Sequence, residues 1–312
     1  MSNNGNFTIS LDFELYWGMR DLVSLKNYSE NIRNVQVVIP RILSLFQKYE
    51  IHATWAIVGF LFAKDKEQLL EMMPARLPAY SRMEYSPYEY IKENDLQNEY
   101  HFAPQSIALI QNTPHQEVAT HTFSHYYVLE NGQDDEQFKS DLECAVAAHP
   151  SPLESIVFPR NQYDDKSLRV AQSVGIRYYR GNPSFSFYKP RPFDSENIFI
   201  RMLRIADAYV NITGQNTFKV EANSDGLVNI PASKFLRPYK RSLKFIENLR
   251  FRRISNAMAY AARNKENYHL WWHPHNFGKN MEENLSFLER ILMQFQSLKS
   301  QHGFQSKSMN EY

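Results

Sequence analysis

The stretch His-Ala-Thr-Trp-Ala-Ile-Val-Gly-Phe at residues 52–60 contains an unbroken apolar run from Trp55 to Val58. A strand with one face in water alternates apolar and polar residues. A strand of a parallel sheet is covered on both faces and tends to be apolar throughout. The run therefore predicts an inner strand of a parallel sheet.

Segments of strand and helix character alternate along the rest of the chain. We predict further strands at 7–15, 118–120, 156–158, 176–179, 228–230 and 269–272, and helices at 39–49, 138–148, 166–174, 243–263 and 280–299. Helices between successive strands are the crossover connections of parallel pairing. About seven such units predict an α/β fold, a distorted (β/α) barrel of about seven parallel strands that is either closed or incomplete.

The domain organisation follows from length and pattern. The 312 residues suffice for one large core. We expect a single domain over 1–300, with insertions at 74–103 and 181–225 that fit no strand–helix unit. Long insertions on a barrel usually build its ligand cleft. We expect 301–312 to be a disordered polar tail.

The composition limits the partners. The chain has 35 Lys and Arg against 34 Asp and Glu, so its net charge gives no attraction for nucleic acid. Its 19 Tyr, 21 Phe and 4 Trp suit a sugar-binding cleft as well as a core. The N-terminal residues do not resemble a signal peptide, and no run approaches the roughly 18 apolar residues of a membrane span. We therefore expect a cytoplasmic protein.

Two carboxylates, Asp12 and Glu14, lie two residues apart at the end of the first predicted strand. Side chains at i and i+2 point to the same face of a strand, and the catalytic groups of parallel barrels lie at this end. An unpaired buried carboxylate is costly. One carboxylate acting as a metal ligand and the other as a base would remove that cost. The alternative is that both project into water.

Histidines follow two other predicted strands. His121 and His125 come after 118–120. Two imidazoles one turn apart can bind one metal ion, and a carboxylate from another strand would complete the site and leave a position for water. The spacing alone also fits two solvated loop histidines. The last strand ends in Trp271-Trp272-His273-Pro274-His275, where His273 is either a general acid or a histidine that caps the core.

In combination and in order, these motifs resemble those of the polysaccharide deacetylases of carbohydrate esterase family 4, a group also described by homology to nodulation chitooligosaccharide deacetylases. The family's T-F-D-D motif corresponds here to Ser10-Leu11-Asp12-Phe13-Glu14, and its G-I-x-A-T-F-F motif to Glu50-Ile51-His52-Ala53-Thr54-Trp55. Its H-[ST]-x-x-H motif corresponds to His121-Thr122-Phe123-Ser124-His125. Its R-x-P-Y motif corresponds to Phe158-Pro159-Arg160-Asn161-Gln162-Tyr163, and its strand ending in His corresponds to Leu270-Trp271-Trp272-His273. The chain departs from the family in two places: one residue separates its two acids, and its arginine follows the proline.

The resemblance implies a deacetylase-type barrel with one divalent metal ion, zinc in our interpretation, held by Glu14, His121 and His125. The metal would activate water, Asp12 would be the base, Arg160 would orient Asp12, and His273 would protonate the departing amine. A backbone N–H near Tyr163 would help the metal to stabilise the oxyanion. The residues expected to contact substrate are Trp17, Asn161, Tyr163, Trp272 and His275.

By the same resemblance, the reaction removes an acyl group, most often acetyl, from an N-acylated sugar. A cytoplasmic substrate would be a surface-polysaccharide precursor that is lipid-linked or nucleotide-linked. Residues 237–253 carry seven Lys and Arg against Glu247. This segment would contact an anionic membrane or a diphosphate, or it is an outer barrel helix with a solvated basic face. Two other functions stay open: a small-amide or ureide amidohydrolase on the same barrel, and a non-catalytic glycan-binding barrel.

Overall fold

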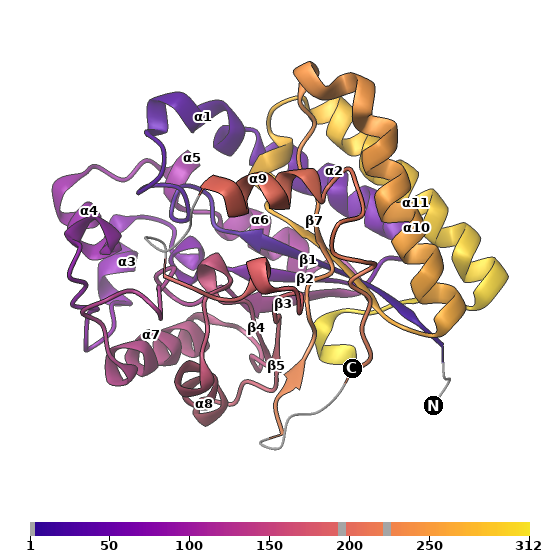
Figure 1. Cartoon of the computed structure of the whole chain (residues 1–312). Helices are drawn as coiled ribbons and strands as arrows, with labels where there is room; N and C mark the ends of the chain where they lie inside the picture. The colour runs from indigo at the N-terminus through magenta and orange to yellow at the C-terminus, as the bar shows by residue number, and fades with distance from the viewer. Residues whose placement is uncertain (1–3, 193–197, 221–225) are drawn as a thin grey trace.

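The computed structural model describes residues 4–192, 198–220 and 226–312. The predicted insertion at 181–225 is therefore described only in part, because 193–197 and 221–225 lie outside these ranges. Within them, nine strands form one sheet at the centre of the molecule (Figure 1). The strands are β1 (Asn6–Phe13), β2 (Ala53–Ile57), β3 (Gln116–Thr120), β4 (Ser155–Ile156), β5 (Tyr178–Tyr179), β6 (Val228–Asn229), β7 (Lys234–Phe235), β8 (Tyr268–Trp272) and β9 (Gln305–Ser306).

The sheet curls until its two edges approach each other. Its strand order is β6–β5–β4–β3–β2–β1–β8–β7, and the pairs along this path are parallel. Only residues 230–233 separate β6 from β7, which stand at opposite ends of the path. The Ala232 N–H donates to the Gly181 carbonyl beside β5, and the Ser233 N–H donates to the His269 carbonyl of β8. These residues bridge the seam, and the predicted distorted (β/α) barrel is confirmed, although β7 and β9 lie outside the predicted strand ranges.

Most helices surround this sheet (Figure 1). They are α1 (Leu25–Arg33), α2 (Val35–Lys48), α3 (Lys66–Glu71), α4 (Pro87–Glu93), α5 (Asn98–His101), α6 (Pro104–Gln111), α7 (Asp135–Ala148), α8 (Asp165–Ser173), α9 (Ile198–Ala206), α10 (Glu247–Asn264) and α11 (Met281–His302). Shorter 3-10 helices are η1 (Gly59–Phe62), η2 (Met83–Tyr85), η3 (Pro159–Asn161), η4 (Ser186–Tyr188), η6 (Arg241–Ile246), η7 (Pro274–Phe277) and η8 (Met309–Glu311). Among the described residues, no helix is both long and apolar enough to cross a bilayer.

β1 separates apolar from polar side chains. All eight of its residues are buried. Its odd-numbered residues belong to the main core beneath the helices: Phe7, Ile9, Leu11 and Phe13. Because side chains alternate across a strand, Thr8, Ser10 and Asp12 point into the barrel. The barrel interior is therefore polar where β1 ends, and this polarity positions the site described below.

The C-terminal segment packs into the barrel, so the disordered tail expected at 301–312 is wrong. β9 pairs in parallel with the start of β1. Met309 is fully buried in a small interior cluster with Ala56, and the Tyr312 hydroxyl lies 2.7 Å from Thr8 Oγ1. The apolar side chains of this segment fill the interior at the N-terminal ends of the strands, and their burial outweighs the polarity of their neighbours.

The predicted insertion at 74–103 folds into η2, α4 and α5. Its aromatic side chains pack against one another instead of lining a cleft. Tyr80 and Tyr85 form a buried cluster with Tyr127, and the Tyr85 and Tyr127 ring centroids lie 5.6 Å apart in an edge-on arrangement. The segment thus supports one side of the barrel mouth.

Candidate active site

Glu14, His121 and His125 meet at the C-terminal end of the barrel. Glu14 follows β1, and both histidines belong to the loop after β3. Glu14 Oε2 lies 3.4 Å from His121 Nε2 and 3.1 Å from His125 Nε2. All three side chains are buried, and one ligand atom from each lies within 4.8 Å of the others. The three residues predicted as metal ligands are therefore brought together.

The hydrogen bonding of these histidines suits a cation. His121 Nδ1 lies 2.7 Å from the Val157 carbonyl oxygen, which can only accept a hydrogen bond. Nδ1 therefore carries a proton, and Nε2 is the ring nitrogen that faces the Glu14 carboxylate. Burial lowers the pKa of His125 to about 4, so that ring is neutral at physiological pH. Two imidazoles and a carboxylate form a donor set for a divalent ion such as zinc.

A buried carboxylate and a glycine fix the two ligand segments. Asp141 of α7 accepts hydrogen bonds from the Phe123 N–H at 2.8 Å, the Ser124 N–H at 3.1 Å and the Ser124 hydroxyl, and so holds the histidine loop. Gly18 leaves the space that Glu14 occupies, because a Cβ there would lie 2.1 Å from the Glu14 carboxyl carbon. The positions of the ligands are thus set before any ion binds.

Asp12 lies beside this triad and is bound to an arginine. Arg180, which follows β5, donates two parallel hydrogen bonds: Nη1 to Asp12 Oδ1 at 2.6 Å and Nη2 to Oδ2 at 2.7 Å. Both side chains are almost completely buried. Burial acts to raise the pKa of Asp12, but the nearby charges of Arg180, His121 and His273 outweigh it and hold that pKa below its ordinary value. Asp12 is therefore held as a carboxylate.

Arg180 belongs to a polar column inside the barrel. Its Nη1 donates to Ser10 Oγ at 2.9 Å, and its Nη2 donates to Asn161 Oδ1 at 2.9 Å. Ser10 Oγ also lies 2.8 Å from His269 Nε2. The guanidinium carbon lies 4.1 Å from the centre of the Trp271 ring. Arg180 was not among the site residues predicted from the sequence, although it directly follows the strand predicted at 176–179.

His273 lies between the two carboxylates at the end of β8. Its Nε2 is 3.6 Å from Glu14 Oε1 and 3.8 Å from Asp12 Oδ2. Its side chain is 21% exposed. The ring of His275 stacks behind it, with centroids 5.0 Å apart. A molecule that approaches from outside therefore meets His273 first.

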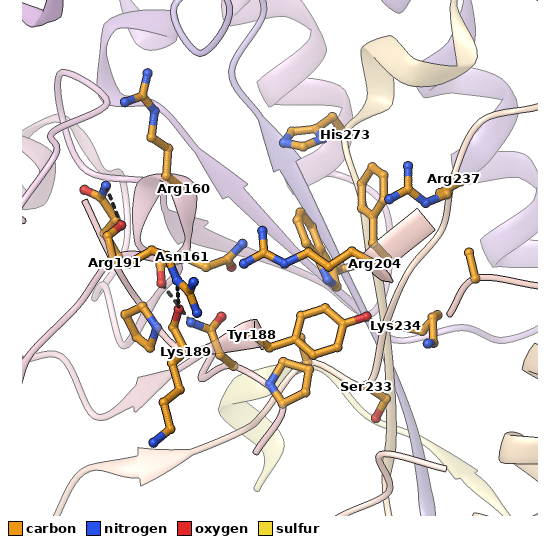
Figure 2. Close-up of a pocket in the computed structure, with 18 of the residues that line it drawn as sticks. Arg160, Asn161, Tyr188, Lys189, Arg191, Arg204, Ser233, Lys234, Arg237 and His273 are labelled. Atoms are coloured by element: carbon orange, nitrogen blue, oxygen red, sulfur yellow. Dashed lines mark hydrogen bonds between the residues drawn. The ribbon is translucent and has the colours of Figure 1, made fainter. Parts of the chain in front are cut away.

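A cavity of about 330 Å³ opens beside His273, near the lower end of the roughly 300–1,000 Å³ common for ligand pockets. Asn161, Trp271 and His273 line the side next to the catalytic groups. In Figure 2, Tyr188 and Arg204 lie between Asn161 on one side and Lys234 on the other. The cavity can hold a small polar ligand with one end beside His273.

The family model for polysaccharide deacetylases matches residues 30–179, a range that includes His121 and His125. The chain is also similar to the solved structure of a proposed polysaccharide deacetylase from Mycobacterium smegmatis, with 11% sequence identity, a TM-score of 0.60, and coverage of 100% of this chain and 90% of that one. Residues 30–179 of the chain form a polysaccharide deacetylase domain. This deacetylase is a hydrolase that acts on an amide carbon–nitrogen bond.

Other solved structures share the fold of the deacetylase. An allantoinase is 10% identical with a TM-score of 0.56, over 99% of this chain and 89% of that one. A GH57-type branching enzyme from the hyperthermophilic archaeon Pyrococcus horikoshii is 11% identical with a TM-score of 0.52, over 98% and 70%. At such identities the likeness concerns the fold alone. None of the curated protein sequences compared with the deacetylase matches it.

Arg160 does not contact Asp12 in the deacetylase, so the role predicted for it is wrong. The φ of Arg160 is 56°, and this left-handed turn sends its side chain to an ion pair with Asp21. The guanidinium lies over the Tyr127 ring, 3.9 Å from its centre. Arg180 reaches Asp12 instead, because residue 180 is the first position after β5 whose side chain points into the barrel.

The two tryptophans expected to contact substrate are core residues. Trp17 and Trp272 are both fully buried. Trp17 Nε1 donates to the His101 carbonyl at 2.8 Å, and Trp272 stacks on Phe277. Trp271 lines the cavity in place of Trp272, because alternation along β8 turns residue 271 to the same face as His273.

Of the other three residues predicted to contact substrate, one lines the cavity and two do not. Asn161 lines the cavity and accepts from Arg180, as described. The Tyr163 hydroxyl accepts from the Asn182 N–H at 3.1 Å, and Tyr163 is not among the cavity-lining residues. His275 is 2% exposed. His275, which is buried, and Tyr163, which holds the Asn182 backbone, therefore support the residues in front of them.

Proposed function

We propose that this deacetylase binds one zinc ion through Glu14, His121 and His125 and removes the acyl group, normally acetyl, from an N-acylated sugar. The observation that carries the proposal is the approach of His273 Nε2 to both Glu14 (3.6 Å) and Asp12 (3.8 Å) beside the triad. A bound metal would polarise the amide carbonyl and lower the pKa of a water molecule.

The side chains of the chain itself would move the protons. Asp12, kept ionised by Arg180, accepts a proton from the attacking water. His273 donates a proton to the nitrogen of the departing amine, which is a poor leaving group without one. A backbone N–H near Tyr163 was expected to stabilise the oxyanion. The N–H groups of Asn161 and Gln162 already donate to the Phe158 and Pro159 carbonyls, so these two do not serve as that donor. Base and acid are thus different residues on neighbouring strands β1 and β8.

The finer substrate assignment is also a proposal. We take the sugar to be a cytoplasmic precursor of a surface polysaccharide, carried on a lipid or a nucleotide. The size of the cavity, about 330 Å³, supports a substrate with one sugar unit at the site more than a long polymer buried within it. Fractionation of cells that produce the chain would test the compartment.

We also propose that the exposed cations at 237–253 contact an anionic membrane. Two of the seven cations at 237–253 are turned inward: Arg250 pairs with Glu247, and Arg253 donates to the Gly214 carbonyl. The exposed remainder includes Lys240, Arg241, Lys244 and Arg252. Flotation with anionic vesicles at low and high salt tests this contact, and absence of binding at low salt contradicts it.

Deacetylation is tested by incubating the purified, zinc-loaded protein with an N-acetylhexosamine and its carrier-linked derivatives and measuring release of acetate and of the free amine. Acetate and amine should appear in equal amounts. Asp12→Asn protein serves as the inactive control. Hydrolysis of small ureides with no activity on any N-acetyl sugar would instead identify the small-amide amidohydrolase.

A further inference from the structure

We propose that the cavity wall around Arg237 is an anion subsite that binds a phosphoryl group attached to the sugar. This inference rests on the proposed deacetylation and adds the chemistry of the rest of the substrate. Arg237 lines the cavity just after β7 and does not belong to the metal triad.

The charge of the cavity is strongly one-sided. Among the described residues that line it there is no Asp or Glu. Six of its lining residues are lysine or arginine: Arg160, Lys189, Arg191, Arg204, Lys234 and Arg237. A concave site with one sign of charge attracts ligands of the opposite sign. A neutral N-acetyl sugar would require no such wall.

Four of these cations already have partners, so the subsite does not depend on them. Arg204 donates from Nε and Nη2 to the Phe187 carbonyl. Arg160 is paired with Asp21, and Lys234 is paired with the buried Asp207. Arg191 donates to the backbone carbonyls of Lys189 and Ser186. In Figure 2, the side chain of Lys189 extends away from the other labelled residues.

Arg237 is different, because within the described part of the chain it has no carboxylate partner. Burial is the main influence that lowers its pKa, and the neighbouring arginines Arg204 and Arg250 add to it. A partly buried cation without a carboxylate of its own is unfavourable unless a ligand supplies an anion. The cavity in front of Arg237 is where such an anion can enter.

The position of Arg237 suits an anion on the same molecule as the acetamide. Phe235 is close to both Arg237 and His273: its ring centroid is 5.8 Å from that of His273 and 5.9 Å from the guanidinium carbon of Arg237. A sugar that presents its amide to His273 can therefore place a neighbouring substituent against Arg237. The planar fork of a guanidinium matches two phosphoryl oxygens.

The binding test uses Arg237→Met, which removes the charge but keeps a long side chain, and Arg252→Met as its control. Arg252 is exposed on α10 and does not line the cavity. Inorganic pyrophosphate binding is measured by titration calorimetry on zinc-loaded protein. Arg237→Met should weaken binding by about tenfold to a hundredfold, and Arg252→Met by less than about twofold. Equal weakening by both variants, or no binding to the wild type at millimolar pyrophosphate, overturns the subsite.

The activity test distinguishes a loss of phosphoryl-group binding from a loss of amide hydrolysis. kcat/KM is measured for a neutral N-acetylhexosamine, a nucleoside diphosphate-linked form and a short prenyl diphosphate-linked form. Arg237→Met should lose about tenfold or more on a diphosphate-linked substrate, mainly through KM, and little on the neutral sugar. Arg237→Lys should recover part of the loss. The better diphosphate substrate identifies the carrier. Equal losses on charged and neutral sugars overturn the inference, whereas pyrophosphate binding by a protein inactive on all three substrates contradicts the proposed function alone.

Discussion

Arg180 and Asp12 form two parallel, charge-assisted hydrogen bonds of 2.6 and 2.7 Å inside the barrel. Because both side chains are buried, neither can exchange its partner for water. The pair fixes the plane of the Asp12 carboxylate and maintains its charge. Arg180 is thus a positioning residue.

Arg180→Met should lower kcat by about 100-fold, the scale of a misplaced base, while the zinc content stays at one ion per chain. Loss of one partner of a buried pair should also lower the free energy of unfolding by about 3–5 kcal/mol. Arg180→Lys should recover part of the activity, since it restores the charge without the fork. Metal analysis, urea denaturation and kcat measure the three effects; Arg180→Met protein that stays folded and keeps kcat within about threefold of the wild type contradicts the role.

Asp12→Asn should keep the metal and the fold but lower kcat by at least about 100-fold, because an amide cannot accept the proton of water. Metal content by mass spectrometry accompanies the rate measurement. If the substitution removes the metal instead, the roles assigned to Asp12 and Glu14 are exchanged.

Purified protein should bind one divalent ion per chain, and Glu14→Gln should weaken that binding at least about tenfold, since even changes behind a ligand have effects of this size. The matched control is Glu117→Gln. Glu117 accepts from the Thr54 hydroxyl at the opposite end of the barrel, so this variant should keep its metal. Metal titration of chelator-treated protein measures both. Equal affinities for Glu14→Gln and the wild type would remove Glu14 from the ligand set.

His273 should be the general acid, and His275 should support it. His273→Ala should lower kcat by about 100-fold or more and remove the alkaline limb of the pH–rate profile. Burial lowers the pKa of His275 to about 3, so His275 is neutral at working pH and His275→Ala should keep that limb. Loss of the alkaline limb only in His275→Ala would reverse the assignment.

Stability should fall as the pH drops from about 6.5 to 4, because buried histidines are held neutral. Burial lowers the pKa of His101 to about 4, and burial and Arg180 lower that of His269 to about 3. Unfolded histidine titrates near 6.5. Within this window the unfolded chain binds more protons, so each residue should contribute a slope of up to about 1.4 kcal/mol per pH unit.

Urea denaturation at a series of pH values measures that slope. His101→Gln should flatten it, because one buried titrating group is gone. His302→Gln, at an exposed position, should leave it unchanged. A slope that is the same in His101→Gln and in the wild type contradicts the assignment.

The metal triad was predictable because its evidence is local. Asp12 and Glu14 end one strand, and the two histidines follow another, so the parallel barrel alone brings them to the same end. The prediction that Trp272, and not Trp271, contacts substrate was wrong by one residue. Neighbouring residues of a strand point to opposite faces, so this shift places the wrong side chain in the barrel. Once His273 was assigned to the inner face, alternation already required Trp271 there.

The sequence does not show that Arg180 is the arginine that pairs with Asp12. Asp12 and Arg180 lie on β1 and after β5, and three strands separate β1 from β5 in the sheet. Which arginine crosses the barrel depends on its curvature and on the φ of 56° that turns Arg160 away. Neither quantity is visible in the order of residues. The C-terminal packing was missed because the few apolar side chains after residue 303 were judged by the polarity of their neighbours.

The ion-binding groups and the cavity wall come from different stretches of the chain. The triad follows β1 and β3, whereas Tyr188 through Arg237 belong to the long connection between β5 and β8 and to the seam strand β7. Substitutions in that connection can alter which substrate is accepted without disturbing the ligands. Selection, natural or in the laboratory, can therefore diversify specificity in one gene segment while catalysis is conserved in another, and a mutant library aimed at new substrates belongs at 182–192, 198–208 and 232–237.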